Sequence, residues 1–104
     1  MKDINEEIKK LGRGIGSESR YRILESLLKG PQTVGDIVKK VKISQPAVSQ
    51  HLTTLKSCGF VDYQKIGQQV YYAIDVKHSL KILRHLVMVF SKCKNSSKKT
   101  TEKI

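Results

Sequence analysis

Apolar and polar positions between Thr33 and Ile74 follow a pattern that organises the whole chain. The first part predicts a short helix from Thr33 to about Lys40, where Thr33 and Asp36 resemble a capping box. Its buried side follows a helical period and consists of Val34, Ile37, Val38 and Val41. The connection Lys42-Ile43 is very short, so the next helix must begin close to the end of this one.

That second helix is predicted to begin at Ser44, a good N-cap, with Pro46 in the first turn, where a missing N–H costs nothing. Its narrow apolar stripe consists of Val48, Leu52 and Leu55. The opposite face is polar, nearly free of acid and rich in short hydrogen-bonding side chains: Ser44, Gln45, Pro46, Ser49, Gln50, Thr53, Lys56 and Ser57. Such a face fits the major groove of DNA, although a merely solvated helix face has the same composition. Two short helices joined by a tight turn form a helix-turn-helix, and this arrangement favours binding in the major groove over a merely solvated face.

An alternating segment after the second helix predicts a β-hairpin. We expect strands at Phe60 to Lys65 and at Gln68 to Ile74, with Ile66-Gly67 as the turn. Three tip residues have side chains able to contact phosphates or base edges: Lys65, Gln68 and Gln69. A solvated tip is an equally good interpretation, and the sequence leaves both open.

Two further helices are predicted before this segment. Ile4, Ile8 and Leu11 give residues 3–11 one apolar stripe, and the glycines of GRGIGS then predict a flexible loop. GRGIGS only faintly resembles a phosphate-binding loop, because the required spacing and the Lys-Ser/Thr pair are missing. Ser17 or Ser19 should cap the next helix, which is expected to run to Lys29. Its expected buried face is Ile23, Leu24, Leu27 and Leu28. Arg20, in its first turn, is a candidate phosphate contact, with a solvated or paired arginine as the alternative.

The last predicted helix covers residues 76–91 and has an unusually broad apolar face. That face contains Leu80, Ile82, Leu83, Leu86, Val87, Val89 and Phe90. A small monomer does not need so wide a face, so we expect a partner helix to cover it. We expect one domain at residues 1–91, followed by a basic, Ser/Thr/Lys-rich and disordered tail at residues 92–104.

The net charge of +11 and pI near 9.8 favour a polyanionic partner, nucleic acid first and an anionic membrane second. The excess is uneven: residues 76–104 hold eight cations and one acid, so the charge does not concentrate on the predicted groove-binding helix. No apolar run reaches the ~20 residues of a membrane span. The polar, acidic N-terminus differs from a signal peptide. Two distant cysteines indicate no disulfide framework, which points to a reducing cytoplasm.

Taken together, the run ISQPAVSQHLTTLKSCGFVDYQKIGQQVYYAI, with SRYRIL and VGDIV before it, resembles the ArsR/SmtB family of winged-helix repressors over roughly residues 8–90. The resemblance implies a homodimer built from the first and last helices that binds a two-fold-symmetric operator. Combined with the apolar stripes, it gives a predicted interface of Ile4, Ile8, Leu11, Leu83, Val87 and Phe90. By motif position, the resemblance places Ser44, Gln45, Ser49, Gln50 and Thr53 against DNA. His51 also lies in the motif but projects toward the helix flank, where we expect packing or an inter-helix hydrogen bond. Gln68 and Gln69 stand where many relatives carry arginine near the hairpin tip, which puts minor-groove contact in question.

The resemblance also raises the possibility of a sensor. The helix before the turn lacks the paired cysteines of one family metal site, and on the last helix only His78 matches a ligand position of another. We therefore predict no metal and no cofactor, leaving His78, His85 and Asp75 as a minor metal-binding alternative. Cys58 and Cys93 form the corresponding thiol-switch alternative.

The sequence thus predicts a mainly α fold with a small β-hairpin (α+β), a winged helix-turn-helix of four helices, two strands and a fifth helix. The predicted function is a sequence-specific DNA-binding transcriptional regulator, a dimeric repressor of an inverted-repeat operator. The alternatives are a sequence-indifferent architectural DNA binder, a metal- or thiol-responsive version of the repressor, and a protein-interaction module. No nucleophile–base pair or cofactor loop indicates an enzyme.

Overall fold

The computed structural model describes residues 4–92, without the side chains at positions 4, 5, 7 and 8. Residues 1–3 and the expected tail after residue 92 lie outside this description. The elements are α1 (Ile4–Ile15), α2 (Glu18–Ser26), α3 (Val34–Val41), α4 (Gln45–Cys58), β1 (Val61–Ile66), β2 (Gln69–Ile74) and α5 (Val76–Ser91). This order confirms the predicted winged helix-turn-helix.

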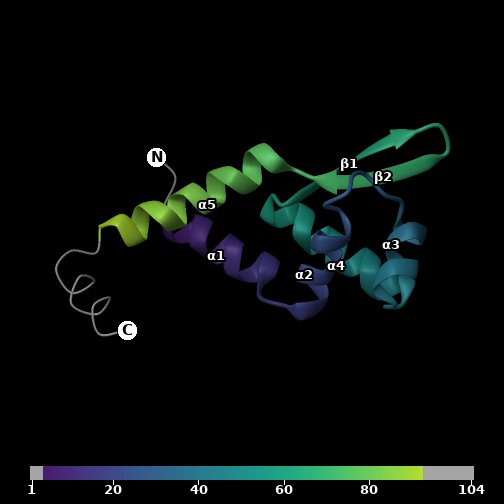
Figure 1. The fold of residues 1–104 in the computed structure, drawn as a ribbon, viewed down its shortest axis with the longest axis horizontal. Coiled ribbons are helices and arrows are strands. Elements are labelled where there is room, and N and C mark those ends of the chain that lie inside the picture. The colour runs from purple at the N-terminus through teal and green to yellow at the C-terminus, as the bar shows by residue number, and fades with distance from the viewer. Residues whose placement is uncertain (1–3, 93–104) are drawn as a thin grey trace.

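The molecule is elongated, with extents of 55 × 33 × 21 Å. In Figure 1, α3 and α4 lie beneath the β1–β2 hairpin, with α3 at the same end of the molecule as the hairpin, and α2 lies between them and α1. At the other end α1 packs along α5, and these two helices lead away from the hairpin (Figure 1). The hairpin therefore forms the surface at one end of the molecule, and α1 and α5 form the surface at the other.

One apolar core joins these parts. Ile23, Ile37, Leu52, Leu55 and Ile82 are completely buried, so α2, α3, α4 and α5 all contribute to it. Burying each such side chain contributes about 1.5–3 kcal/mol before entropy is subtracted. The stripe predicted for α4 is confirmed, and this burial fixes which face of α4 remains outside.

Local capping explains where the helices begin. Thr33 and Asp36 form the expected capping box, with Oγ1 of Thr33 3.2 Å from the Asp36 amide that donates to it. Ser44 caps α4 by accepting from the amide of Ala47, and Ser17, rather than Ser19, caps α2.

Two predicted helix ends are wrong. α1 continues through Gly12 and Gly14 to Ile15, so the expected loop is mostly helix. A Cβ at Gly14 would overlap the ring of Phe60, which shows that this glycine permits a close approach of α1 to the chain after α4. α2 ends at Ser26 instead of Lys29, and Leu28 is consequently 71% exposed rather than buried.

The hairpin is antiparallel, with the register running from Val61↔Ile74 to Ile66↔Gln69. The turn is Gly67-Gln68, one residue later than predicted, and Gly67 has a left-handed φ of +63°. Its base is tied to the loop before α3 by two backbone bonds, because Gln32 and Tyr72 exchange N–H···O contacts of 2.9 and 2.7 Å. The hairpin is thus anchored to the same helices that hold α4.

Candidate nucleic-acid interface

The two faces of α4 differ completely in exposure. Val48, Leu52, Leu55 and Cys58 have no exposed surface. All the predicted contact residues on this helix are exposed: Ser44, Gln45, Pro46, Ser49, Gln50, Thr53 and Lys56. Because the apolar side of α4 is packed into the core, its polar side must remain at the surface.

Hydrogen bonds within α4 determine what its polar face offers. Oγ1 of Thr53 donates to the carbonyl of Ser49 over 3.0 Å, which leaves the hydroxyl oxygen as an acceptor. Gln45 and Gln50 are exposed, and their amides have geometry suited to the paired N6 and N7 groups of adenine. The face therefore carries side chains that can both donate to and accept from base edges.

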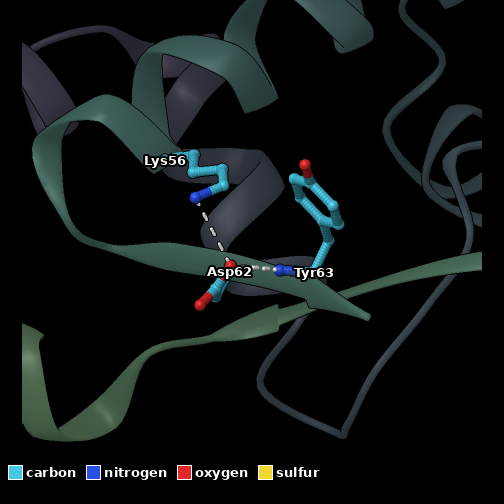
Figure 2. A network of polar contacts seen from close by, with 3 residues as sticks. All are labelled: Lys56, Asp62 and Tyr63. Atoms are coloured by element: carbon cyan, nitrogen blue, oxygen red, sulfur yellow. Dashed lines mark hydrogen bonds and ion pairs between the residues drawn. The ribbon is translucent and has the colours of Figure 1, made fainter. Parts of the chain in front are cut away.

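Lys56 is exposed but already engaged. Its Nζ lies 3.5 Å from Oδ1 of Asp62 on β1 and 5.3 Å from the ring centroid of Tyr63 (Figure 2). The same Oδ1 accepts the Tyr63 amide at 2.8 Å. That backbone hydrogen bond, followed by the charge of Lys56, lowers the pKa of Asp62 below its ordinary value of 3.8. α4 and the hairpin are linked by this contact, which sequence reasoning missed.

The hairpin tip is exposed, as its predicted contact residues require. Lys65, Gln68 and Gln69 all lie at the surface, and Ile66 beside them is 57% exposed. Lysine and glutamine can contact phosphates, but the tip adds only one positive charge. Any contribution to affinity from this tip is therefore small beside that of a basic patch.

The structure does not support the prediction that Arg20 is available to phosphate. Its side chain is half-buried, and Nε donates to the carbonyl of Gly14 over 3.2 Å. Arg22 is exposed, but one of its terminal nitrogens donates to the carbonyl of Val41 over 2.5 Å. Both guanidinium groups satisfy carbonyls at helix ends, where intrahelical donors run out. They hold α1, α2 and α3 together.

The residues considered for metal or redox chemistry have structural contacts. Asp75 caps α5 by accepting from the amide of His78, and His85 is half-buried further along that helix. The His78 ring lies against Gly59, where a Cβ would come within 2.7 Å of Nε2. Within the described part of the chain, no three His, Cys, Asp or Glu side chains gather as metal ligands would.

Cys58 does not fit the thiol-switch alternative, because its side chain is completely buried in the core. Cys93 lies outside the described residues. His51 is half-buried with Nδ1 covered by protein, which agrees with the packing role expected for it.

The helical end of the molecule presents a broad apolar surface. Leu83, Val87 and Phe90 of α5 are 41, 64 and 69% exposed. Leu11, predicted to lie with them at an interface, is instead 8% exposed, because α1 turns it into the subunit's own core. The side chains of Ile4 and Ile8 lie outside the described residues.

An apolar groove beside this surface was not predicted. It has a volume of ≈ 210 Å³ between α1, α2 and α5, and its walls include Ile15, Tyr21, Leu28 and Leu83. The exposure of Leu28 follows from the early end of α2, which hydrophobic periodicity alone could not show.

A helix-turn-helix with an exposed polar second helix, followed by an anchored hairpin, defines a winged-helix DNA-binding protein. Among residues 4–92, no helix combines the length and apolar character needed to cross a bilayer. The family model described as "Bacterial regulatory protein, arsR family" matches residues 17–63.

Individual relatives agree with this match. HTH-type transcriptional regulator CmtR of Mycobacterium tuberculosis is 36% identical over 80 residues, covering 77% of this chain and 68% of CmtR. Transcriptional repressor SdpR of Bacillus subtilis is 35% identical over 63 residues, covering 61% of this chain and 70% of SdpR. Transcriptional activator HlyU of Vibrio cholerae is 34% identical over 77 residues, covering 71% of each chain.

A solved structure shares the architecture as well. The homodimeric winged helix-turn-helix DNA-binding domain Mb0332 of Mycobacterium bovis superposes with a TM-score of 0.68 at 25% identity, covering 85% of this chain and 81% of that one. The chain belongs to the ArsR family, and it is a DNA-binding transcriptional regulator. This class is not an enzyme class.

Proposed function

We propose that this chain acts as a homodimer that binds a two-fold-symmetric operator and represses the promoter that the operator overlaps. The complete division of α4 into a buried face and an exposed polar face carries this proposal. A helix held in that way can enter the major groove without disturbing the core.

Sequence preference is assigned to α4. Gln45 and Gln50 read base edges, while Ser44, Ser49 and Thr53 supply shorter contacts and Pro46 offers an apolar one. Lys56 and the hairpin tip supply affinity that does not depend on sequence.

The apolar surface of α5 supports dimerisation. Val87 and Phe90 are large and exposed on α5, and this helix leads away from the hairpin in Figure 1, so a second copy can cover them without hiding α4. Two-fold symmetry then presents two α4 helices to successive major grooves, one turn (~34 Å) apart. The relative from Mycobacterium bovis is homodimeric, which supports dimerisation of this chain.

The proposal includes residues 1–91 as the folded unit and residues 92–104 as a basic tail that attracts DNA without regard to sequence. We place this regulator of transcription in the cytoplasm, together with the DNA that it binds. Repression is supported by the relative SdpR, which is a transcriptional repressor. The relative HlyU is a transcriptional activator, so activation is the alternative direction of regulation.

Selection of bound duplexes from a random pool tests the function directly. We expect an inverted repeat with half-sites about ten base pairs apart and strong preference over random duplex in competition. No preference would indicate an architectural DNA binder. Transcription in vitro from a promoter carrying the selected site then gives the sign, since repression requires fewer transcripts when protein is added.

A further inference from the structure

A cleft of ≈ 660 Å³ separates α4 from the hairpin. Leu52, Thr53 and Ser57 line it from the helix, and Tyr63 and Val70 line it from the strands. Lys56 is the one charged side chain among its lining residues. In DNA, a sugar-phosphate ridge separates each major groove from the neighbouring minor groove. If α4 lies in one groove and the hairpin reaches toward the next, that ridge must pass through this cleft.

The two hydroxyl groups that α4 places in the cleft already donate to carbonyls of the same helix. Oγ of Ser57 donates its proton to the carbonyl of Thr54 at 2.8 Å, and Thr53 donates to Ser49. Lys56 is the one cation that lines the cleft, so it is the side chain suited to neutralise a phosphate there, and its flexible four-carbon stem lets Nζ turn toward the phosphate without movement of the backbone.

Asp62 stands in the way of this contact. Its carboxylate holds Lys56 at 3.5 Å (Figure 2). Asp62 itself does not line the cleft. The ion pair is exposed on both sides, with 43 and 66% of the two side chains accessible, and such pairs are weak. A phosphodiester that also releases counterions can displace the carboxylate.

We propose that the cleft between α4 and the hairpin binds one backbone phosphate through Lys56, and that Asp62 competes with this phosphate and lowers affinity for DNA of every sequence. This inference rests on the proposed placement of α4 in the major groove. It assigns Asp62 a positioning role, since it acts through Lys56 and contacts no base.

The test uses the full chain and a short labelled duplex of random sequence, with the selected operator in parallel. Asp62→Asn keeps an oxygen that can accept the Tyr63 amide while it removes the charge. We expect this variant to bind both duplexes roughly two- to fivefold more tightly per subunit, the range set by exposed ion pairs. Lys56→Gln should weaken binding to both and reduce the salt slope by about 0.9 per subunit.

Glu6→Gln is the matched control for charge. Glu6 forms an exposed ion pair with Lys9 at 3.6 Å on α1, at the end of the molecule away from the hairpin (Figure 1). Glu6→Gln removes one negative charge, as Asp62→Asn does, and we expect it to increase affinity for DNA less than Asp62→Asn does. Circular dichroism confirms that each variant is folded.

The decisive comparison adds Asp62→Asn to Lys56→Gln. If Asp62 acts through Lys56, most of the gain disappears in the double variant. An undiminished gain, or a Lys56→Gln variant with wild-type affinity and salt slope, overturns the phosphate cleft while leaving the proposed regulator intact. Failure of the wild-type chain to bind any duplex at low salt overturns the proposed function and the cleft together.

Discussion

Gly14 of α1 lies so close to the aromatic ring of Phe60 that a Cβ atom would overlap it. This contact joins the first helix to the segment that leaves α4. Phe60 is 4% exposed, so neighbouring side chains confine its ring, and its backbone carbonyl accepts from the Asp75 amide and the Ser79 hydroxyl at the start of α5.

Gly14→Ala is therefore expected to destabilise the fold. Alanine gains about 1 kcal/mol over glycine in a helix, but overpacking typically costs about 1–3 kcal/mol. Gly12→Ala is the matched control, because nothing lies within 4 Å of its Cβ position in the same helix. We expect Gly12→Ala to raise the midpoint of urea unfolding and Gly14→Ala to lower it. Equal stabilisation by both would contradict the contact with Phe60.

These two glycines show that sequence patterns predict local contacts but not contacts between distant parts of the chain. Helix starts such as Thr33 and Ser44 depend on neighbours three residues away, so the sequence predicted them. The role of Gly14 depends on Phe60, 46 positions along the chain. Likewise, nothing local distinguishes an arginine that binds phosphate from Arg20, which binds a helix end.

In the candidate interface, too, some features could be predicted from the sequence and others could not. The exposed face of α4 followed from periodicity, because burial of Leu52 and Leu55 fixes which side of the helix faces out. The partner of Lys56 did not, since Asp62 approaches it through the geometry of the chain reversal between α4 and β1. Leu11 was assigned to an interface because an apolar stripe on a helix does not reveal which neighbour covers it.

Replacing Gln45 or Gln50 by alanine should relax sequence preference without unfolding the protein, because both side chains are exposed. Loss of a two-bond contact to a base reduces discrimination by about 1–3 kcal/mol. The ratio of operator to random-duplex affinity measures this change. Gln64→Ala, an exposed glutamine on β1, should leave the ratio unaltered. If all three variants keep the wild-type ratio, the assignment of base contacts to α4 is wrong.

The carboxyl of Asp62 should titrate below 3.8, since hydrogen bonding from the Tyr63 amide and the charge of Lys56 both lower its pKa. Because the folded-state pKa is lowered, the stabilising effect is present above the ordinary value and is lost as pH falls through the lowered one. Carbon-13 NMR of the carboxyl group measures this directly. In Lys56→Gln the pKa should rise only in part, as the backbone hydrogen bond is the larger cause. A wild-type pKa at or above 3.8 would show that neither contact persists in solution.

Val87→Asp should separate the dimer. Val87 is 64% exposed on α5, and a two-fold interface there would bury two new carboxylates without partners. We expect the dimer to weaken by about 2 kcal/mol or more, roughly 30-fold, in sedimentation equilibrium. Ile66→Asp is the control, because Ile66 is 57% exposed but lies on the hairpin. Operator binding by Val87→Asp should fall together with dimerisation, since one α4 reads only half of a two-fold site. Should Val87→Asp remain as dimeric as the wild type while Ile66→Asp becomes monomeric, the interface would have to be placed at the hairpin, and α4 could not reach the groove as proposed.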